Sequence, residues 1–108
     1  MNKVYLNFKE FELGFLCQQD NKYIWVPNAK KIKQCFSKYS GGIDLFFLSF
    51  VDETVYSEIP YHFSEFLESA ERNDLKKAAN IKKEDCDFVK LYKMATLKYL
   101  NQDFYISI

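Results

Sequence analysis

The sequence has few of the residue types on which recognisable functional motifs depend. Its 108 residues include three glycines, two prolines, one histidine and one arginine. The glycines match neither of the glycine-rich loops that cradle phosphate groups, so no nucleotide cofactor is expected. One arginine and a formal net charge of zero also argue against direct nucleic-acid binding, because nucleic-acid binders carry an excess of basic side chains on one face.

Cysteine is scarce as well, and its spacing argues against a metal centre. Cys17, Cys35 and Cys86 are odd in number, include no Cys-x-x-Cys pair, and have only His62 as a possible nitrogen ligand. We interpret all three as free, buried thiols in a reducing compartment. The sequence therefore predicts no metal ion.

Catalytic groups are also poorly represented. His62 lies between two aromatic residues at the expected start of a helix, and we interpret it as a structural histidine in preference to a general base. Glu65, Glu68 and Glu71 lie in a phenylalanine-rich stretch, at positions typical of the solvated face of a helix. We therefore predict no catalytic residue and no enzymatic activity; a small enzyme or ligand-binding domain is the alternative.

Long apolar runs are absent too. The longest, Leu45–Val51, has the length of a strand, whereas a membrane helix needs about 18 apolar residues. The first residues lead directly into an alternating strand pattern, without the apolar block of a signal peptide. These features predict a cytoplasmic protein that makes no contact with a membrane.

Apolar and aromatic side chains, by contrast, are plentiful. Hydrophobic residues make up 48% of the chain and aromatic residues 19%, which suffices for one core, so residues 1–108 are expected to form a single domain. The charges are unevenly spread, because residues 39–75 hold Arg72 against eight acids while both flanking segments are basic. The middle third of the chain is therefore an acidic block.

The apolar residues follow a period of two in the first quarter of the chain, which predicts strands. Alternating residues flank a short connection at Lys9 and Glu10, and a polar turn at residues 19–22 leads to a third strand that ends at Pro27. These three strands are expected to form an antiparallel meander. The residues expected to share one face of the second strand are Phe11, Leu13, Phe15 and Cys17.

Two further strands and a loop are predicted later in the chain. Residues 43–51 are apolar on both faces, typical of a central strand or of one that offers a face to a partner. Residues 52–59 are interpreted as a loop, and residues 104–108 alternate as a short C-terminal strand.

Helical periods occupy the stretches between these strands. A short basic helix is expected over residues 28–36, at one end of the sheet. A phenylalanine-rich helix begins at Pro60, breaks near residues 69–73 and continues to a cap at Asn80. Asp85 is the expected N-cap of the last helix, whose Lys90, Lys93 and Lys98 are expected to face water. Together these elements predict an α+β fold: an antiparallel β-sheet (meander), then a helical half packing on it, with a short C-terminal strand.

Several stretches resemble a known family. Residues 4–6, 13–16 and 23–26 are similar to the opening hairpin and third strand of the N-terminal subdomain of HipA-type toxin kinases. Two stretches depart from that family, because residues 48–51 lack its usual proline and residues 95–99 lack its usual glycines. The second half resembles the family's phenylalanine-rich helix after a proline, its acidic-arginine helix and its capped final helix, at residues 60–67, Glu71, Arg72, Leu75, Asn80, Ile81, Asp85, Phe88 and Leu91.

The resemblance implies a function in protein recognition. HipA-type kinases need several hundred residues, whereas this chain stops at Ile108, so we expect a small stand-alone member similar to the HipS-like antitoxins of split HipBST-type systems. Such an antitoxin binds and neutralises a HipA-like serine/threonine kinase, HipT, alongside a DNA-binding protein, HipB. The alternative is a structural or regulatory subunit that bridges the kinase and a helix-turn-helix repressor without inhibiting the kinase.

The expected contacts with the kinase lie just before the phenylalanine-rich helix. Tyr56, Ile59 and Tyr61 are the large apolar side chains of that segment, and such groups dominate the binding energy of interfaces. The surrounding acids are Asp52, Glu53 and Glu58, and they would complement a basic, phosphate-handling cleft. The alternative interpretation is that Tyr56, Ile59 and Tyr61 close the core over a loop.

Overall fold

The structure, a computed structural model, describes residues 2–39, 52–97, 100–101 and 104–108. The strands are β1 (Lys3–Phe8), β2 (Phe11–Gln19), β3 (Lys22–Pro27), β4 (Thr54–Tyr56), β5 (Leu100–Asn101) and β6 (Phe104–Ser107). The helices are α1 (Ala29–Lys38), α2 (Tyr61–Ser69), α3 (Asn73–Ala79) and α4 (Asp87–Thr96). The predicted strand at residues 43–51 lies outside the described residues.

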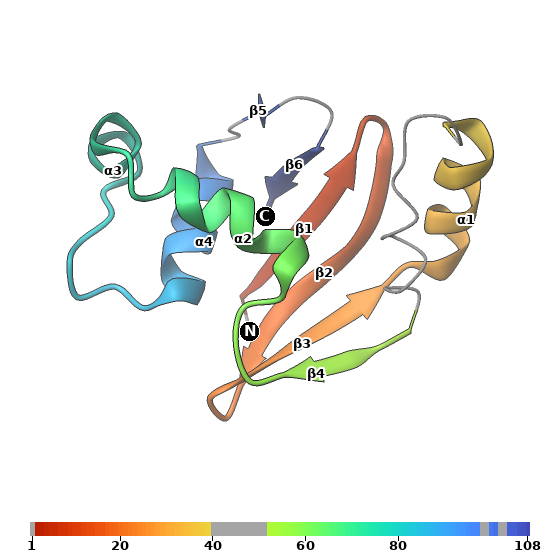
Figure 1. The fold of residues 1–108 in the computed structure, drawn as a ribbon, viewed down its shortest axis with the longest axis horizontal. Coiled ribbons are helices and arrows are strands. Elements are labelled where there is room, and N and C mark those ends of the chain that lie inside the picture. Colours follow the sequence, from red (N-terminus) through yellow and green to blue (C-terminus); the bar gives the residue numbers. More distant parts are fainter. Residues whose placement is uncertain (1, 40–51, 98–99, 102–103) are drawn as a thin grey trace.

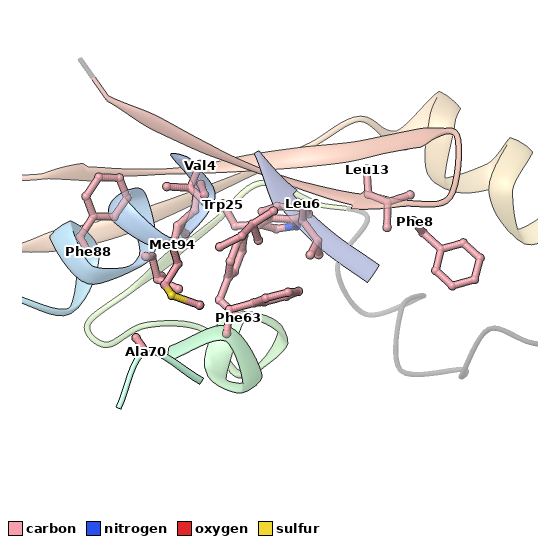
Figure 2. Packing of buried hydrophobic residues seen from close by; sticks show 14 of the residues in the cluster. Val4, Leu6, Phe8, Leu13, Trp25, Phe63, Ala70, Phe88 and Met94 are labelled. Atoms are coloured by element: carbon pink, nitrogen blue, oxygen red, sulfur yellow. The ribbon is translucent and has the colours of Figure 1, made fainter. Parts of the chain in front are cut away.

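The strands form one antiparallel sheet in the order β4-β3-β2-β1-β6-β5 (Figure 1). The predicted meander of the first three strands is confirmed, and the C-terminal strand β6 adds to its β1 side. α2 and α4 pack against one face, as Figure 2 shows from the side. The predicted α+β fold is therefore confirmed.

Tight turns join the first three strands. Asp20 and Asn21 have φ values of 50° and 65°, the left-handed conformation that a type I′ hairpin loop requires. Asparagine and aspartate tolerate this conformation better than most other residues, because their short side chains bond to the local backbone. Lys9 also has a φ of 50° in the connection between β1 and β2.

The pairing of β1 with β2 contains a β-bulge. Leu6 pairs with Gly14, whereas the next residue, Asn7, pairs with Glu12. Leu13 is therefore the extra residue on β2, and the alternation of side chains reverses beyond it.

This reversal makes the expected face of the second strand wrong. Leu13 lies on the helix-covered face, but Leu16 joins it there and is fully buried. Phe15 and Cys17, which the period of two placed with Leu13, lie on the opposite face of the sheet, paired with Tyr5 and Lys3 respectively. A single inserted residue changes the phase of the pattern, and hydrophobicity alone gives no sign of it.

The bulge also fixes the position of α1. The backbone N–H of Asn28 donates to the Leu13 carbonyl at 2.8 Å, and the Asn28 side chain caps the helix by accepting from the Lys31 N–H. At the other end, the ammonium of Lys38 bonds to Glu10 at 2.6 Å, which holds the pKa of that carboxyl at about 2. The predicted basic helix at one end of the sheet is confirmed.

The core lies between the sheet and the helices α2 and α4. Trp25, Leu6 and Val4 point from the sheet towards Phe63 of α2 and Met94 of α4 (Figure 2). All five side chains are at most 1% exposed. Burying side chains of this size stabilises the fold by roughly 2 kcal/mol each, which is the main favourable contribution here.

The C-terminal strand β6 closes the β1 side of the meander. Asn7 Nδ2 donates to the Ser107 Oγ at 3.0 Å and to the Tyr105 carbonyl at 3.3 Å. The Tyr105 hydroxyl donates in turn to the Lys9 carbonyl at 2.9 Å. These bonds satisfy Asn7, which is 5% exposed, and they join residues nearly a hundred positions apart.

The helix boundaries largely follow the predictions. α2 ends at Ser69 and α3 begins at Asn73, so the expected break is present. Asn80 ends α3 with a φ of 57°, the left-handed C-cap conformation that favours asparagine after glycine.

Two predictions near α4 are wrong. The N-cap is Cys86, and the Asp85 carboxylate instead accepts from the Lys82 N–H at 2.8 Å and from Lys93 Nζ at 2.6 Å. Lys90 is ion-paired as well, with Glu71 at 3.1 Å, and its side chain is only 18% exposed. Lys90 therefore links α4 to Glu71, and Lys93 links it to Asp85 in the preceding connection. Lys98 lies outside the described residues.

We expect Gly14→Ala to lower the free energy of unfolding by about 3 kcal/mol. Gly14 has a φ of 151°, and an added Cβ would lie 2.6 Å from the Val26 carbonyl oxygen and 2.8 Å from the Cα of Pro27. Both neighbours are backbone atoms and cannot rotate away. Urea denaturation measures the effect, with Ser37→Ala on the exposed side of α1 as the control, expected within about 0.5 kcal/mol of the wild type. Equal midpoints for the two variants would contradict the close approach of the β3 backbone to Gly14.

Candidate protein-binding site

The three expected contact residues occupy different environments. Tyr61, the first residue of α2, is 76% exposed. Tyr56 at the end of β4 and Ile59 in the following connection are half-buried and pack against the core. Tyr61 is therefore available to a partner, while Tyr56 and Ile59 also help to close the core.

The start of α2 explains this division. Pro60 is buried, and its φ of −60° and ψ of 149° turn the chain into the helix. The Phe63 N–H donates to the Pro60 carbonyl at 2.9 Å, and Phe63 then enters the core completely. Tyr61 lies two positions earlier, on the outer side of the same turn, so its ring extends towards solvent.

Residues 52–59, expected to be a loop, contain the strand β4. Thr54, Val55 and Tyr56 pair with β3, which already has a strand pattern on its other side. The segment is short and surrounded by acids, so its three β-forming residues gave too weak a pattern to predict a strand. Pairing with β3 supplies the stabilisation that the local sequence lacks.

Val55 is a surface residue that the sequence analysis missed. Its side chain is 58% exposed, and it points to the face of β4 opposite Tyr56, because neighbours along a strand alternate. Recognition of β4 as a strand would have indicated this, since a half-buried Tyr56 implies an outward Val55. Val55 and Tyr61 are two of the three large apolar residues exposed in the described part of the chain.

The charged residues of this segment of the chain are all acidic. Residues 52–65 contain four acids and neither lysine nor arginine. β4 is also the terminal strand of the sheet, with β3 as its partner among the described strands. We call this region the β4–α2 surface, formed by Asp52, Glu53, Val55, Glu58 and Tyr61, all of which are exposed. It extends around the β4 edge of the sheet, because Val55 lies on the face opposite the helices whereas Tyr61 lies on α2.

His62 lies behind this surface and is part of the core. It is 8% exposed, with its ring 4.6 Å from that of Trp25 and 4.8 Å from that of Phe63. Burial among these rings disfavours the charged imidazolium and lowers the pKa of His62 to about 3. The side chain is therefore neutral at physiological pH and packs as an aromatic residue, in keeping with the structural role expected of it.

The thiols and acids show no metal-binding arrangement in the part of the chain that the structure describes, where no three histidine, cysteine or acidic side chains converge. Cys17 and Cys35 are buried free thiols as expected, and burial raises the pKa of each. Cys86 is free but exposed, which corrects the prediction, because the N-cap position of α4 places it at the surface. Of the described helices, none has the length and apolar character needed to span a bilayer.

Acidification from pH 7 to pH 5 is expected to lower the free energy of unfolding by about 2 kcal/mol. The unfolded chain binds a proton at His62 below about pH 6.5, whereas the folded chain does not until about pH 3, so stability is lost as the pH falls through this window. Urea denaturation at both pH values measures the loss. In His62→Leu this part of the pH dependence should vanish; an unchanged slope in the variant would show that another group is responsible.

The chain was also compared with protein-family models, curated proteins and solved structures, and none of them matches it. The resemblance to the N-terminal subdomain of HipA-type kinases rests on the residues quoted from the sequence.

Proposed function

We propose that this protein is a cytoplasmic antitoxin of a split HipBST-type toxin–antitoxin system, which binds and neutralises a HipA-like serine/threonine kinase, HipT. The observation that carries the proposal is the β4–α2 surface, where Val55 and Tyr61 are exposed among acids. The family resemblance of the sequence supports the identity of the partner.

The chemistry of the β4–α2 surface suits a kinase. A kinase handles the phosphates of ATP with basic groups, and an acidic surface is electrostatically complementary to them. Exposed aromatic and aliphatic side chains supply the desolvated contacts that dominate affinity, while the surrounding acids steer the encounter. On this basis Tyr61 is the expected anchor, and Asp52, Glu53 and Glu58 set the orientation.

Inhibition follows from differential affinity. In a fused kinase the resembling subdomain lies on the catalytic region of the same chain; a separate chain must find that region in trans. A ligand that binds one kinase conformation more tightly than another shifts the population towards it. The antitoxin therefore neutralises the kinase by binding an inactive conformation or by covering the cleft.

Tyr61→Ala and Val55→Ala are each expected to weaken kinase binding by ten- to a hundred-fold, or about 1.4 to 2.7 kcal/mol. Both side chains are mostly exposed, so the fold should persist, as circular dichroism would show. Ile108→Ala is the matched control, because Ile108 is as exposed as Val55 at 58% and lies in the C-terminal segment after β6. Tyr56→Ala and Ile59→Ala need their stability measured first, because both residues contact the core.

The proposal is tested by co-expression with the neighbouring reading frame, which is expected to encode the kinase, followed by co-purification, a growth test and a kinase assay. Recovery of growth, with reduced kinase activity, supports the antitoxin. A complex that leaves kinase activity unchanged supports the alternative of a bridging subunit between kinase and repressor. If no complex forms, or if Tyr61→Ala and Val55→Ala bind like the wild type, the β4–α2 surface is not the kinase-binding site.

A further inference from the structure

The face of the sheet opposite α2 and α4 is apolar at its centre. In one row, Tyr5 pairs with Phe15, and Phe15 pairs with Val26. In the next row, two residues further along β2, Cys17 pairs with Ile24, and Ile24 pairs with Val55. Paired residues on neighbouring strands share a face, so these side chains form two parallel rows across β1 to β4. We call this the open face, formed by Lys3, Tyr5, Glu12, Phe15, Cys17, Lys22, Ile24, Val26 and Val55.

The open face is separate from the hydrophobic core. Within the described residues, the core cluster includes Leu6, Leu16 and Trp25 from the other side of the sheet but no residue of these two rows. An antiparallel sheet that faces water normally alternates apolar and polar residues, with the polar ones outward. Here the two rows at the centre of the face are mostly aromatic and aliphatic, with polar and charged residues beyond them, and an exposed apolar patch is typical of an interaction surface.

Contacts within the open face hold its centre together. The rings of Tyr5 and Phe15 meet edge to face with centroids 5.6 Å apart, and the Lys3 ammonium lies 4.4 Å from the centre of the Phe15 ring. Tyr5 and Phe15 are nevertheless still partly exposed, and Val55 is 58% exposed. The rows are thus preformed, with ordered apolar area that a partner can cover.

Lys22 and Glu12 lie at opposite ends of the open face. Lys22 pairs with Gln19 beyond one apolar row, whereas the Lys3 ammonium lies over the Phe15 ring near the centre. Glu12 lies beyond the other row and, with Tyr5, Phe15 and Val26, lines a shallow hollow there. One end of the face therefore carries Lys22 and the other carries Glu12, with the two apolar rows between them.

We propose that a second copy of this chain binds the open face, so that two sheets pack face to face about a twofold axis lying across the strands. This rotation reverses the strand direction, which brings Lys22 of each copy to the end that carries Glu12 of the other. The apolar rows then stack at the centre, in the manner of a β-sandwich. The pattern is self-complementary, which is what a symmetric contact requires.

The size of the face predicts a weak dimer. The face spans four strands about 4.8 Å apart. Along the strands it spans the two apolar rows and the positions of Lys22 and Glu12 beyond them, spaced about 7 Å apart, so it covers roughly 400 Å² per copy. Stable interfaces bury about 800 Å² per partner, so we expect a dissociation constant on the order of 100 µM. The chain is then monomeric at about 1 µM, where kinase binding is measured, and the two proposals are tested independently.

Sedimentation equilibrium from about 10 µM to 1 mM tests the dimer. The mean mass should rise with concentration from the monomer value of 12.9 kDa towards twice that value. Glu12→Lys and Lys22→Glu should each weaken association by about ten-fold, because two attractive contacts become repulsive. An equimolar mixture of the two variants should associate again, since every changed charge then faces an opposite one.

Matched controls make the same charge changes elsewhere, with Glu84→Lys and Lys83→Glu in the exposed connection between α3 and α4. Circular dichroism verifies that all variants are folded, as expected for exposed positions. A wild-type chain that stays at the monomer mass up to 1 mM overturns the proposal. So does unaltered association of Glu12→Lys and Lys22→Glu, or a mixture that fails to recover association.

Discussion

One inserted residue in β2 determines the arrangement of most of this structure. The bulge at Leu13 reverses the alternation of β2, so that Leu16 enters the core while Phe15 points outward. The Leu13 carbonyl accepts a hydrogen bond from Asn28, just before α1. At position 14, next to the bulge, the backbone of β3 leaves room only for glycine. The core, the first helix and the open face all depend on this local change of register.

The sheet is covered by helices on one face, and β4 contributes to both sides. Tyr56 contacts the core, whereas Val55 lies in a row of the open face and also at the acidic β4–α2 surface. The two proposed partners use different chemistry: the β4–α2 surface is uniformly acidic and suits a basic partner, while the open face carries both signs and suits a copy of itself. Because Val55 belongs to both surfaces, self-association and kinase binding would compete for it.

The sequence predicted those parts of the structure that local interactions control. The turn at Asp20 and Asn21 and the cap at Asn80 use residues that tolerate positive φ, and the structure has both. The break between α2 and α3 was likewise predicted. The prediction failed for Asp85, whose carboxylate binds Lys93 instead of capping α4. It also failed for β4, which is a strand only because it pairs with β3.

For the candidate site, the sequence by itself determined the composition: an acidic segment with Tyr56, Ile59 and Tyr61, in a chain with one arginine and one histidine. Only the tertiary structure decided which of these side chains a partner can reach, because exposure depends on what packs against each residue. It also decided the faces of β2 and the position of β6 beside β1. Side-chain periodicity reports a face relative to neighbours in sequence, whereas a bulge and a long-range strand pairing are set by contacts between distant residues.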